Sequence, residues 1–282
     1  MLGTMSSCIT KEKSGDKPSD QKTFSDMVYP ALDTENSRWF FFSSASRPFG
    51  MVNLSPDTEI DGAWGSGYRY KTDTIKGFSH IHAWQMAGIS VMPVTISSEN
   101  EKTVFEDFYS KFSHETEKIA PGYQYVELDR YQIKTAITST TRVGLHHYTF
   151  PAANQAAILF NLNTLLGPSE NQDGELNKIS NRELYGKVVI SPTSRRPKPV
   201  TVFFKVLLDA EIADIIQDEK TGNYLVNLNK ADKDVLMKVG ISYTSIANAS
   251  QNIEKELPHW DFDQVVAESK SEWNNLLGRI KV

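Results

Sequence analysis

The stretch that decides the fold is YQYVELDRYQIKTAITSTTRVGLHHYTF, residues 123–150. It contains three short runs rich in aromatic and β-branched side chains, separated by Asp129-Arg130 and by Ser139-Thr140-Thr141. The runs cover 123–128, 131–138 and 142–150. Short runs of this composition, divided by a few polar residues, are typical of strands joined by tight turns. The stretch therefore predicts an antiparallel β-meander.

The same pattern continues downstream of the meander. Further strand candidates lie at 155–166, 186–191, 199–208 and 234–243, and a loop rich in proline and arginine occupies 192–198. Ten or more strands without intervening helices favour two large antiparallel sheets packed face to face. The predicted fold class is mainly β, a large antiparallel β-sandwich over residues 23–245.

The last part of the chain, 246–282, changes to a helical period. Apolar residues recur at helical spacing over 246–257, and a second apolar stripe follows Asp261, a predicted N-cap, up to Gly278. Residues 279–282 are predicted to begin a strand. A chain that stops after starting a strand suggests a fragment, or a domain separated from its partner.

Composition excludes several functional classes. The net charge is −5, from 30 Lys+Arg and 35 Asp+Glu, which excludes a strongly basic nucleic-acid binder as the default. No apolar run approaches the length of a membrane-spanning helix. Cys8 is the one cysteine in the sequence, so an internal disulfide framework and a multi-cysteine metal site are excluded.

Residues 1–22 are polar and aperiodic, which predicts a disordered leader. Met5-Ser6-Ser7-Cys8 is loosely similar to the end of a bacterial lipoprotein signal, in which the cysteine is lipidated and a polar tether follows it. Residues 1–7 lack an apolar core long enough for a complete signal peptide. The alternative interpretation is a lone thiol in a flexible tail.

The stretch that carries chemistry is 47–94, where glycines interrupt a sequence rich in aromatic and hydrogen-bonding side chains. The glycines indicate turns and close backbone approaches. Flat aromatic faces beside amides, imidazoles and carboxylates suit a sugar, because a pyranose stacks one apolar face and needs fixed partners for its hydroxyls. An aromatic-rich corner of the sandwich without a ligand explains the composition equally well.

His80-Ile81-His82 places two imidazoles on one face of a strand. Two imidazoles are too few for a zinc site, and no cysteine is nearby to complete one. Hydrogen bonding to substrate and satisfied burial both remain open for these histidines. His146 and His147 are adjacent on a strand and are expected to face opposite ways, so they do not form a site together.

Several of these segments resemble the N-terminal domain of glycoside hydrolase family 92, the bacterial exo-acting α-mannosidases common in gut Bacteroidetes. The segments are RPFGMVNLSPDT (47–58), WGSGYRY (64–70), GFSHIHAWQMAG (77–88), VMPV (91–94), TRVGLHHYTFP (141–151), VGISYTSIANASQNIEKEL (239–257) and WDFDQVVAESKSEWNNLLGRIKV (260–282). They cover roughly 24–282, in order and nearly without gaps. His147 departs from the pattern, since an arginine is expected there.

The resemblance implies a sandwich of the galactose-mutarotase-like type that packs on an (α/α)6 catalytic barrel, in cis or in trans. Members are inverting and calcium-dependent, and the calcium sits in the subsite of the terminal mannose. In inverting enzymes the acid and base carboxyls stand about 6.5–9.5 Å apart. In this family both carboxyls and most calcium ligands come from the barrel, so we nominate no catalytic residue and no tightly bound metal here.

The resemblance also implies a binding wall for mannose-containing glycans. The predicted substrate-binding residues are Phe49, Gly50, Asp57, Trp64, His80, His82 and Trp84. Members with an HxHxW arrangement resemble those that cut α-1,2-linked mannose, with the tryptophan packed against the leaving-group sugar. The alternative for Trp84 is a core position beside Phe78 and Met92. Lipidation of Cys8 would place the protein in the periplasm or on the outer membrane. This lipid anchor is the only membrane contact that we expect.

Three functions remain open at this point. The first is the substrate-recognition half of an inverting α-1,2-mannosidase, which is inactive without its barrel. The second is a stand-alone mannoside-binding protein, weak because half of the pocket walls are missing. The third is a remnant that binds nothing.

Overall fold

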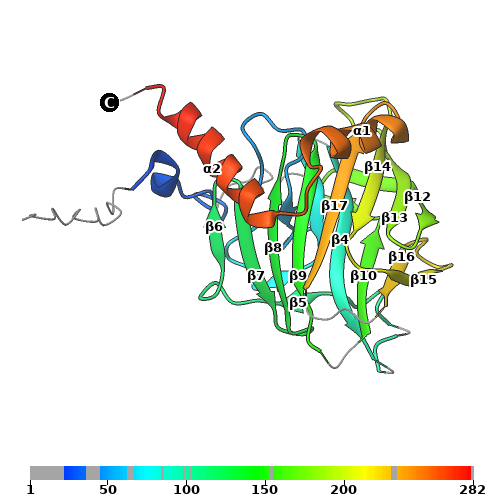
Figure 1. The fold of residues 1–282 in the computed structure, drawn as a ribbon. Coiled ribbons are helices and arrows are strands. Elements are labelled where there is room, and N and C mark those ends of the chain that lie inside the picture. Colours follow the sequence, from blue (N-terminus) through cyan, green and yellow to red (C-terminus); the bar gives the residue numbers. More distant parts are fainter. Residues whose placement is uncertain are drawn as a thin grey trace, which may run out of the picture.

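The computed structural model describes residues 22–35, 45–61, 67–83, 86–97, 99–101, 103–152, 155–229 and 234–280. Two antiparallel sheets pack face to face, and two helices near the C-terminus lie against the outer face of the larger sheet (Figure 1). The predicted fold class, a large antiparallel β-sandwich followed by helices, is therefore confirmed.

The smaller sheet has the strand order β1–β3–β4–β10–β16–β15. Its strands are β1 (Ser55–Pro56), β3 (Phe78–Ala83), β4 (Met86–Ile96), β10 (Gln155–Asn161), β16 (Tyr224–Leu228) and β15 (Ile212–Gln217). β3 and β4 are buried along almost their whole length. Strands buried on both faces lack the polar alternation of half-exposed strands.

The larger sheet has the order β11–β12–β13–β14–β17–β9–β8–β7–β6. Its strands are β11 (Leu165–Leu166), β12 (Ser169–Ser180), β13 (Glu183–Ile190), β14 (Val200–Leu208), β17 (Asp234–Ser242), β9 (Val143–Thr149), β8 (Ile133–Ser139), β7 (Tyr123–Leu128) and β6 (Lys118–Ala120). β7, β8 and β9 are consecutive neighbours, which confirms the predicted meander. A separate pair joins β2 (Thr74–Ile75) and β5 (Ser110–Lys111).

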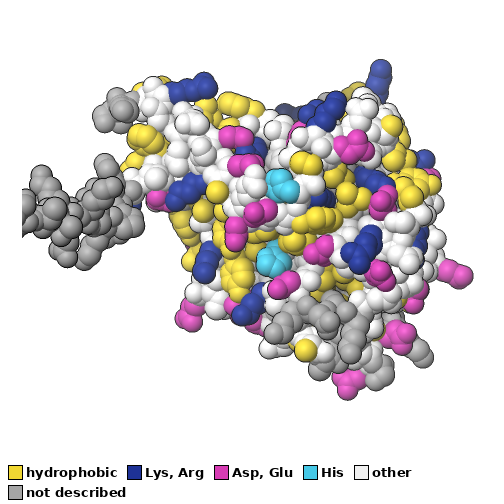
Figure 2. All heavy atoms as spheres, viewed as in Figure 1, with side chains coloured by type: hydrophobic (Ala, Val, Ile, Leu, Met, Phe, Trp, Pro, Cys, Tyr) yellow, Lys and Arg dark blue, Asp and Glu magenta, His cyan; other side chains and the backbone are white. Residues whose placement is uncertain are grey.

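The main core lies between the two sheets, where residues such as Phe78, Met92, Phe160 and Phe204 are fully buried. A second apolar cluster lies on the outer face of the larger sheet, where Val143 and Leu145 of β9 meet the helices. Figure 2 shows hydrophobic side chains gathered across the middle of this outer face. The helices therefore cover only part of an apolar surface.

The helices are α1 (Ile246–Glu256) and α2 (Phe262–Leu277). The predicted N-cap is confirmed, because the Asp261 carboxylate accepts a hydrogen bond from the Gln264 N–H at 2.9 Å. α2 ends at Gly278, also as predicted. A short 3-10 helix, η1 (Phe24–Met27), lies beside α2, where the Ser25 N–H donates to Asn274 Oδ1 at 2.8 Å.

The strand predicted over 279–282 is not formed at residues 279 and 280, and 281–282 lie outside the described residues. Arg279 and Ile280 form a turn and a bend rather than a strand, because the Arg279 N–H bonds back to the Leu276 carbonyl. Among the described residues, none of the helices combines the length and the apolarity of a membrane span.

Candidate functional site

Three of the sequence motifs meet at one end of the sandwich. The Met51 and Val52 N–H groups both donate to the Thr141 carbonyl, at 2.8 and 3.1 Å, which ties the 47–58 segment to the turn between β8 and β9. The Asn53 N–H donates to the His80 carbonyl at 3.0 Å, which ties the same segment to β3. Segments far apart in sequence thus form one end of the fold.

Phe49 lies in a tight turn at this end. The Gly50 N–H donates to the Arg47 carbonyl at 3.0 Å, Pro48 occupies the second turn position, and Phe49 has φ 59°. This is a type II turn, whose third position normally takes glycine. The left-handed backbone costs an ordinary residue about 1–2 kcal/mol.

The strained Phe49 turn places its ring outside the core. The side chain of Phe49 is 90% exposed, the highest value among the large hydrophobic residues that the structure describes. A residue that is both strained and fully presented to solvent contributes little to folding. Strain of this kind occurs mainly where a side chain is held for function.

Gly50 follows directly and is closely surrounded by backbone. A Cβ at this position would lie 3.2 Å from the Arg47 carbonyl oxygen and 3.3 Å from that of Val52. Gly50 therefore lets the chain fold back tightly after Phe49, and no side chain covers the ring at this point.

Asp57 and His82, two of the predicted site residues, bind each other directly. His82 Nε2 lies 2.7 Å from Asp57 Oδ1, and the Ser79 hydroxyl donates to the other carboxylate oxygen. His82 Nδ1 donates to the Asn53 carbonyl at 2.7 Å, because a carbonyl can only accept. Nε2 and Oδ1 therefore share one further proton, and this pair is almost completely buried.

This buried pair fixes the backbone behind the exposed turn. It links the segment 53–57 to β3 through both imidazole nitrogens. Removing either partner would leave a buried charge or an unsatisfied polar group, which is strongly destabilising. The arrangement suits a rigid support for a binding surface; direct sugar contact by Asp57 or His82 stays a prediction.

His80 belongs to a second buried network that crosses between the sheets. Its Nδ1 donates to the Ile89 carbonyl at 2.6 Å, and its Nε2 lies 2.9 Å from Nε2 of His146 on β9. The Tyr148 hydroxyl donates to His146 Nδ1 at 2.8 Å. Each donor has one acceptor, so both imidazoles are neutral with fixed tautomers: His146 Nε2–H donates to His80 Nε2.

Burial of the two imidazoles lowers their pKa values and favours their neutral forms. Desolvation lowers the pKa of His80 to about 4 and holds the pKa of His146 well below its ordinary value. Ile89, whose carbonyl anchors His80, has φ 56°, a rare conformation for a β-branched residue. Gly144 makes room for the network, because a Cβ there would lie 2.7 Å from a His80 ring carbon.

His80 therefore has the contacts of a satisfied buried histidine, one of the two interpretations that the sequence left open. His146 and His147 do face opposite ways: His146 is buried, whereas His147 is partly exposed and lies 3.3 Å from Asp234. The pairing of His80 with His146 was not predicted from the sequence. Gly144, two residues before His146, was the available signal.

Three predicted residues cannot be placed. Trp64, Trp84 and Cys8 lie outside the described residues. Their predicted roles in stacking, linkage selection and lipidation remain predictions.

The calcium that the family resemblance implies has no ligand set among the described residues. No three His, Cys, Asp or Glu side chains within those ranges are close enough together to hold a metal ion. Asp57, the carboxylate at the motif end, is already engaged by His82 and Ser79. The expectation that the catalytic domain of the family supplies most of the calcium ligands stays a prediction.

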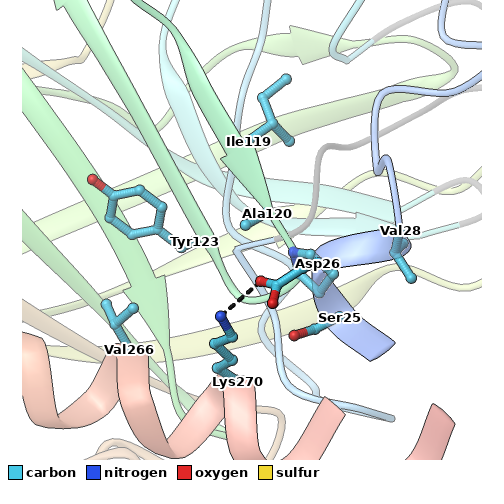
Figure 3. Close-up of a pocket in the computed structure, with 9 residues that line it drawn as sticks. Ser25, Asp26, Val28, Ile119, Ala120, Tyr123, Val266 and Lys270 are labelled. Carbon is cyan, nitrogen blue, oxygen red and sulfur yellow. Dashed lines mark hydrogen bonds and ion pairs between the residues drawn. The ribbon is translucent and has the colours of Figure 1, made fainter. Parts of the chain in front are cut away.

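Two cavities lie beside α2, away from the predicted site residues. One, of about 280 Å³, is lined by η1, β6, β7 and α2, and it contains the ion pair between Asp26 and Lys270, at 2.7 Å (Figure 3). Hydrogen bonds from Lys270 and Thr23 hold the pKa of Asp26 well below its usual range. The other, of about 320 Å³, adjoins Tyr123, Tyr125 and Phe262. Neither cavity is lined by one of the predicted substrate-binding residues.

Comparison with protein families gives two matches that together span most of the chain. Residues 27–242 match the Glycosyl hydrolase family 92 N-terminal domain. Residues 248–282 match the Glycosyl hydrolase family 92 catalytic domain. The second match contains both α1 from Asn248 onward and α2.

Individual relatives are distant in sequence. An uncharacterized secreted glycosidase of Arthroderma benhamiae is 23% identical over 281 residues, covering 86% of this chain and 36% of that protein. A family GH92 α-mannosidase of Bacteroides thetaiotaomicron, also solved with mannoimidazole, superposes with a TM-score of 0.77 at 23% identity, over 92% of this chain and 38% of that one.

A family GH92 inverting mannosidase of Bacteroides thetaiotaomicron VPI-5482 superposes with a TM-score of 0.72 at 19% identity, over 92% of this chain and 37% of that one. At these identities the superpositions establish a shared fold. The chain spans less than two fifths of the length of these relatives, 36–38%.

Proposed function

Because the chain belongs to glycosyl hydrolase family 92, we propose that it is the substrate-recognition β-sandwich part of an inverting α-mannosidase acting on mannose-containing glycans. The observation that carries the proposal is Phe49, an aromatic ring 90% exposed on a strained turn within the family motif. A relative of the same fold has been solved with mannoimidazole, which supports a mannose-type ligand.

The exposed ring would contact the apolar face of a pyranose. An aromatic face supplies contact area and orientation, and the sugar hydroxyls take hydrogen bonds from polar groups around it. Gly50 lets the chain fold back closely after the ring, and the buried Asp57–His82 pair keeps the supporting backbone rigid. Trp64 and Trp84 belong to neighbouring motif segments, and we propose them as further aromatic walls.

Linkage selection is proposed for Trp84, in favour of α-1,2-linked mannose. An indole wall beside the leaving-group sugar lets one glycosidic geometry stack and blocks others, so selection comes partly from exclusion. Within a complete enzyme, Trp84→Ala should lower kcat/KM for α-1,2-mannobiose, by an amount that corresponds to about 1–3 kcal/mol of lost transition-state stabilisation. An aryl mannoside, whose leaving group does not need the same wall, should be affected less.

Catalysis is proposed to come from the family's catalytic domain, which carries the general acid, the general base and the calcium. The sandwich would orient the terminal sugar while those carboxyls act across about 6.5–9.5 Å. The chain alone should therefore bind without hydrolysing. A lipid on Cys8, and hence a periplasmic or outer-membrane location, is part of the same proposal.

The second candidate is a stand-alone mannoside-binding protein. The same exposed Phe49 favours it, because a ring held in a strained turn can bind sugar without a catalytic domain. The two candidates differ in whether adding a family 92 catalytic domain in trans restores hydrolysis.

Saturation-transfer NMR with α-1,2-mannobiose, α-1,6-mannobiose and cellobiose tests the proposal on the purified chain, with calcium-containing hydrolysis assays in parallel. We expect saturation transfer to the mannobioses, strongest for the α-1,2 isomer, and no hydrolysis above blank. Hydrolysis by the chain alone would mean that it holds its own acid and base. Absence of binding to all three sugars would favour a remnant that binds nothing.

A further inference from the structure

The turn that presents Phe49 is attached to helix α2. The Trp273 indole N–H donates to the Ser46 carbonyl at 2.8 Å, and Arg47 forms ion pairs with Glu268, at 3.3 Å, and with Glu272. These contacts join residues separated by more than 200 positions in sequence, since Arg47 and Glu272 are 225 apart. The first residues of the turn are therefore held by the helix.

Arg47 is buried, and all three nitrogens of its forked guanidinium group make contacts. Its side chain is 4% exposed, its Nε donates to the Ser139 carbonyl at 2.9 Å, and its second terminal nitrogen also reaches the Val265 carbonyl at 3.3 Å. The planar guanidinium thus connects the turn, the end of β8 and α2 at once. A lysine keeps the charge but has a single nitrogen, so it cannot reproduce this fork.

The turn needs such restraint because Phe49 has φ 59°. If the restraint were lost, rotation of the Pro48–Phe49 peptide would give a type I turn, which an ordinary residue adopts without strain. The same rotation would redirect the Phe49 ring. Strained conformations persist only when the surrounding contacts over-determine them.

We propose that Arg47 is a positioning residue that holds Phe49 in its sugar-contacting orientation by fixing the turn to α2. The inference rests on the proposed function, in which Phe49 contacts the sugar. α2 lies within the part of the chain that matches the family's catalytic domain. Arg47 therefore couples the position of α2 to the position of the sugar-contacting ring of Phe49.

The test is a double-mutant cycle of Arg47→Lys and Phe49→Ala in the full chain, read out as the affinity for methyl α-mannoside. Arg47→Lys alone should weaken binding about tenfold, because the competent turn is populated about a tenth of the time. In the Phe49→Ala background, the same change should have no further effect on affinity. Trp273→Phe, which removes the donor to Ser46 but keeps an aromatic ring, should act in the same direction as Arg47→Lys.

A second readout does not depend on sugar binding. Fluorophenylalanine incorporated at position 49 should give one sharp fluorine resonance in the otherwise native chain, and a shifted or split resonance with Arg47→Lys. The matched control is Arg182→Lys, which alters another arginine–glutamate contact, here between the turn that joins β12 to β13 and Glu211, at 3.5 Å. That control should leave both the affinity and the fluorine signal unchanged.

The outcomes separate the two proposals. An unchanged fluorine signal with Arg47→Lys in a folded protein would overturn the positioning role, and so would an equal loss of affinity in the Phe49→Ala background. A changed fluorine signal in a chain that binds no mannoside would support the clamp on the turn and refute the proposed function.

Discussion

The backbone conformation and the exposure of Phe49, considered together, indicate a functional role for this residue. The aromatic ring is 90% exposed, and its φ of 59° belongs to a turn position that favours glycine. Neither property helps the chain to fold. Natural proteins accept such local strain mainly where activity requires it.

Replacement of Phe49 should therefore separate stability from binding. We expect Phe49→Gly to raise the free energy of unfolding by roughly 0.5–1 kcal/mol, since glycine adopts positive φ without strain but loses more chain entropy. Phe49→Ala is the matched control, because it removes the ring but keeps a Cβ in the left-handed region. Urea unfolding should show a gain for Phe49→Gly only; a loss of stability in Phe49→Gly would mean that the ring supports the fold.

The His80–His146 pair should make the protein less stable as the pH falls. Both pKa values are lower in the folded state, to about 4 for His80, than the ordinary 6.5 of an unfolded histidine. Between these values the unfolded chain binds protons that the folded chain does not. The neutral pair thus makes its full contribution to the free energy of unfolding above about pH 6.5. This contribution decreases toward pH 4 by about 1.4 kcal/mol per pH unit for each histidine.

His146→Gln tests this dependence through a slope rather than through absolute stability. Glutamine can still hydrogen-bond to Tyr148 or His80 but does not titrate. In urea unfolding between pH 4.5 and 5.5, the slope of the unfolding free energy against pH should be smaller than in the unaltered chain. The decrease should be about 1.4 kcal/mol per pH unit, which corresponds to one proton fewer taken up on unfolding. Parallel slopes for the two proteins would show that His146 is accessible to protons in the folded state.

At the scale of strands and helices, Gly144 of β9 marks where the two sheets meet closely. Its missing side chain accommodates the His80 ring at 2.7 Å from the Cβ position. We expect Gly144→Ala to destabilise the protein by about 1–3 kcal/mol, because an added methyl group overpacks a rigid ring.

Gly88 of β4 provides the matched control for Gly144. Its nearest neighbour, an Asn171 amide nitrogen, would lie 3.4 Å from an added Cβ, which is ordinary contact. Gly88→Ala should therefore leave the thermal midpoint nearly unchanged or raise it. An equal drop in both variants would mean that strand backbone strain, rather than the His80 contact, decides the effect.

The sequence predicted those elements whose signal is local. β7 spans Tyr123–Leu128 as predicted, and the caps of α2 at Asp261 and Gly278 are correct, because strand alternation and helix caps involve neighbouring residues. β12, Ser169–Ser180, was missed because its sequence is polar and much of the strand is exposed. Only residues 80–82 of β3 were placed on a strand, and β4 was obscured by glycine and by burial on both faces.

The site shows the same division between local and long-range signals. The aromatic and glycine pattern around Phe49 was visible in the sequence. The contact between His80 and His146 spans 66 residues, and that between Arg47 and Glu272 spans 225. No periodicity encodes such contacts, because they arise from the packing of one sheet or helix on another.

At the scale of the whole molecule, the apolar surface around α2 is only partly covered. Five exposed large hydrophobic residues lie within 24–32, and the partly buried Tyr123, Tyr125 and Val266 adjoin the outer apolar cluster. The five are Phe24, Met27, Val28, Tyr29 and Leu32. Extended apolar patches are uncommon on monomers that function alone.

We therefore expect the isolated chain to self-associate and to bind the dye ANS. A Met27→Ser, Leu32→Ser double variant, at side chains 65% and 74% exposed, should reduce both effects without lowering the thermal midpoint. Light scattering coupled to size exclusion measures the first effect. A monodisperse unaltered monomer without ANS binding would contradict an uncovered partner surface.

The proposed function requires that the motif end of the sandwich, around Phe49, contacts an α-mannosyl sugar. Backbone amide NMR of the isotope-labelled chain, titrated with methyl α-mannoside and separately with methyl α-glucoside, tests it most directly. We expect saturable shifts for the mannoside at residues 47–53, 78–83 and 139–142, with weaker shifts for the glucoside. Shifts confined to the cavity of Asp26, Tyr123 and Lys270, or equal responses to both sugars, would contradict it.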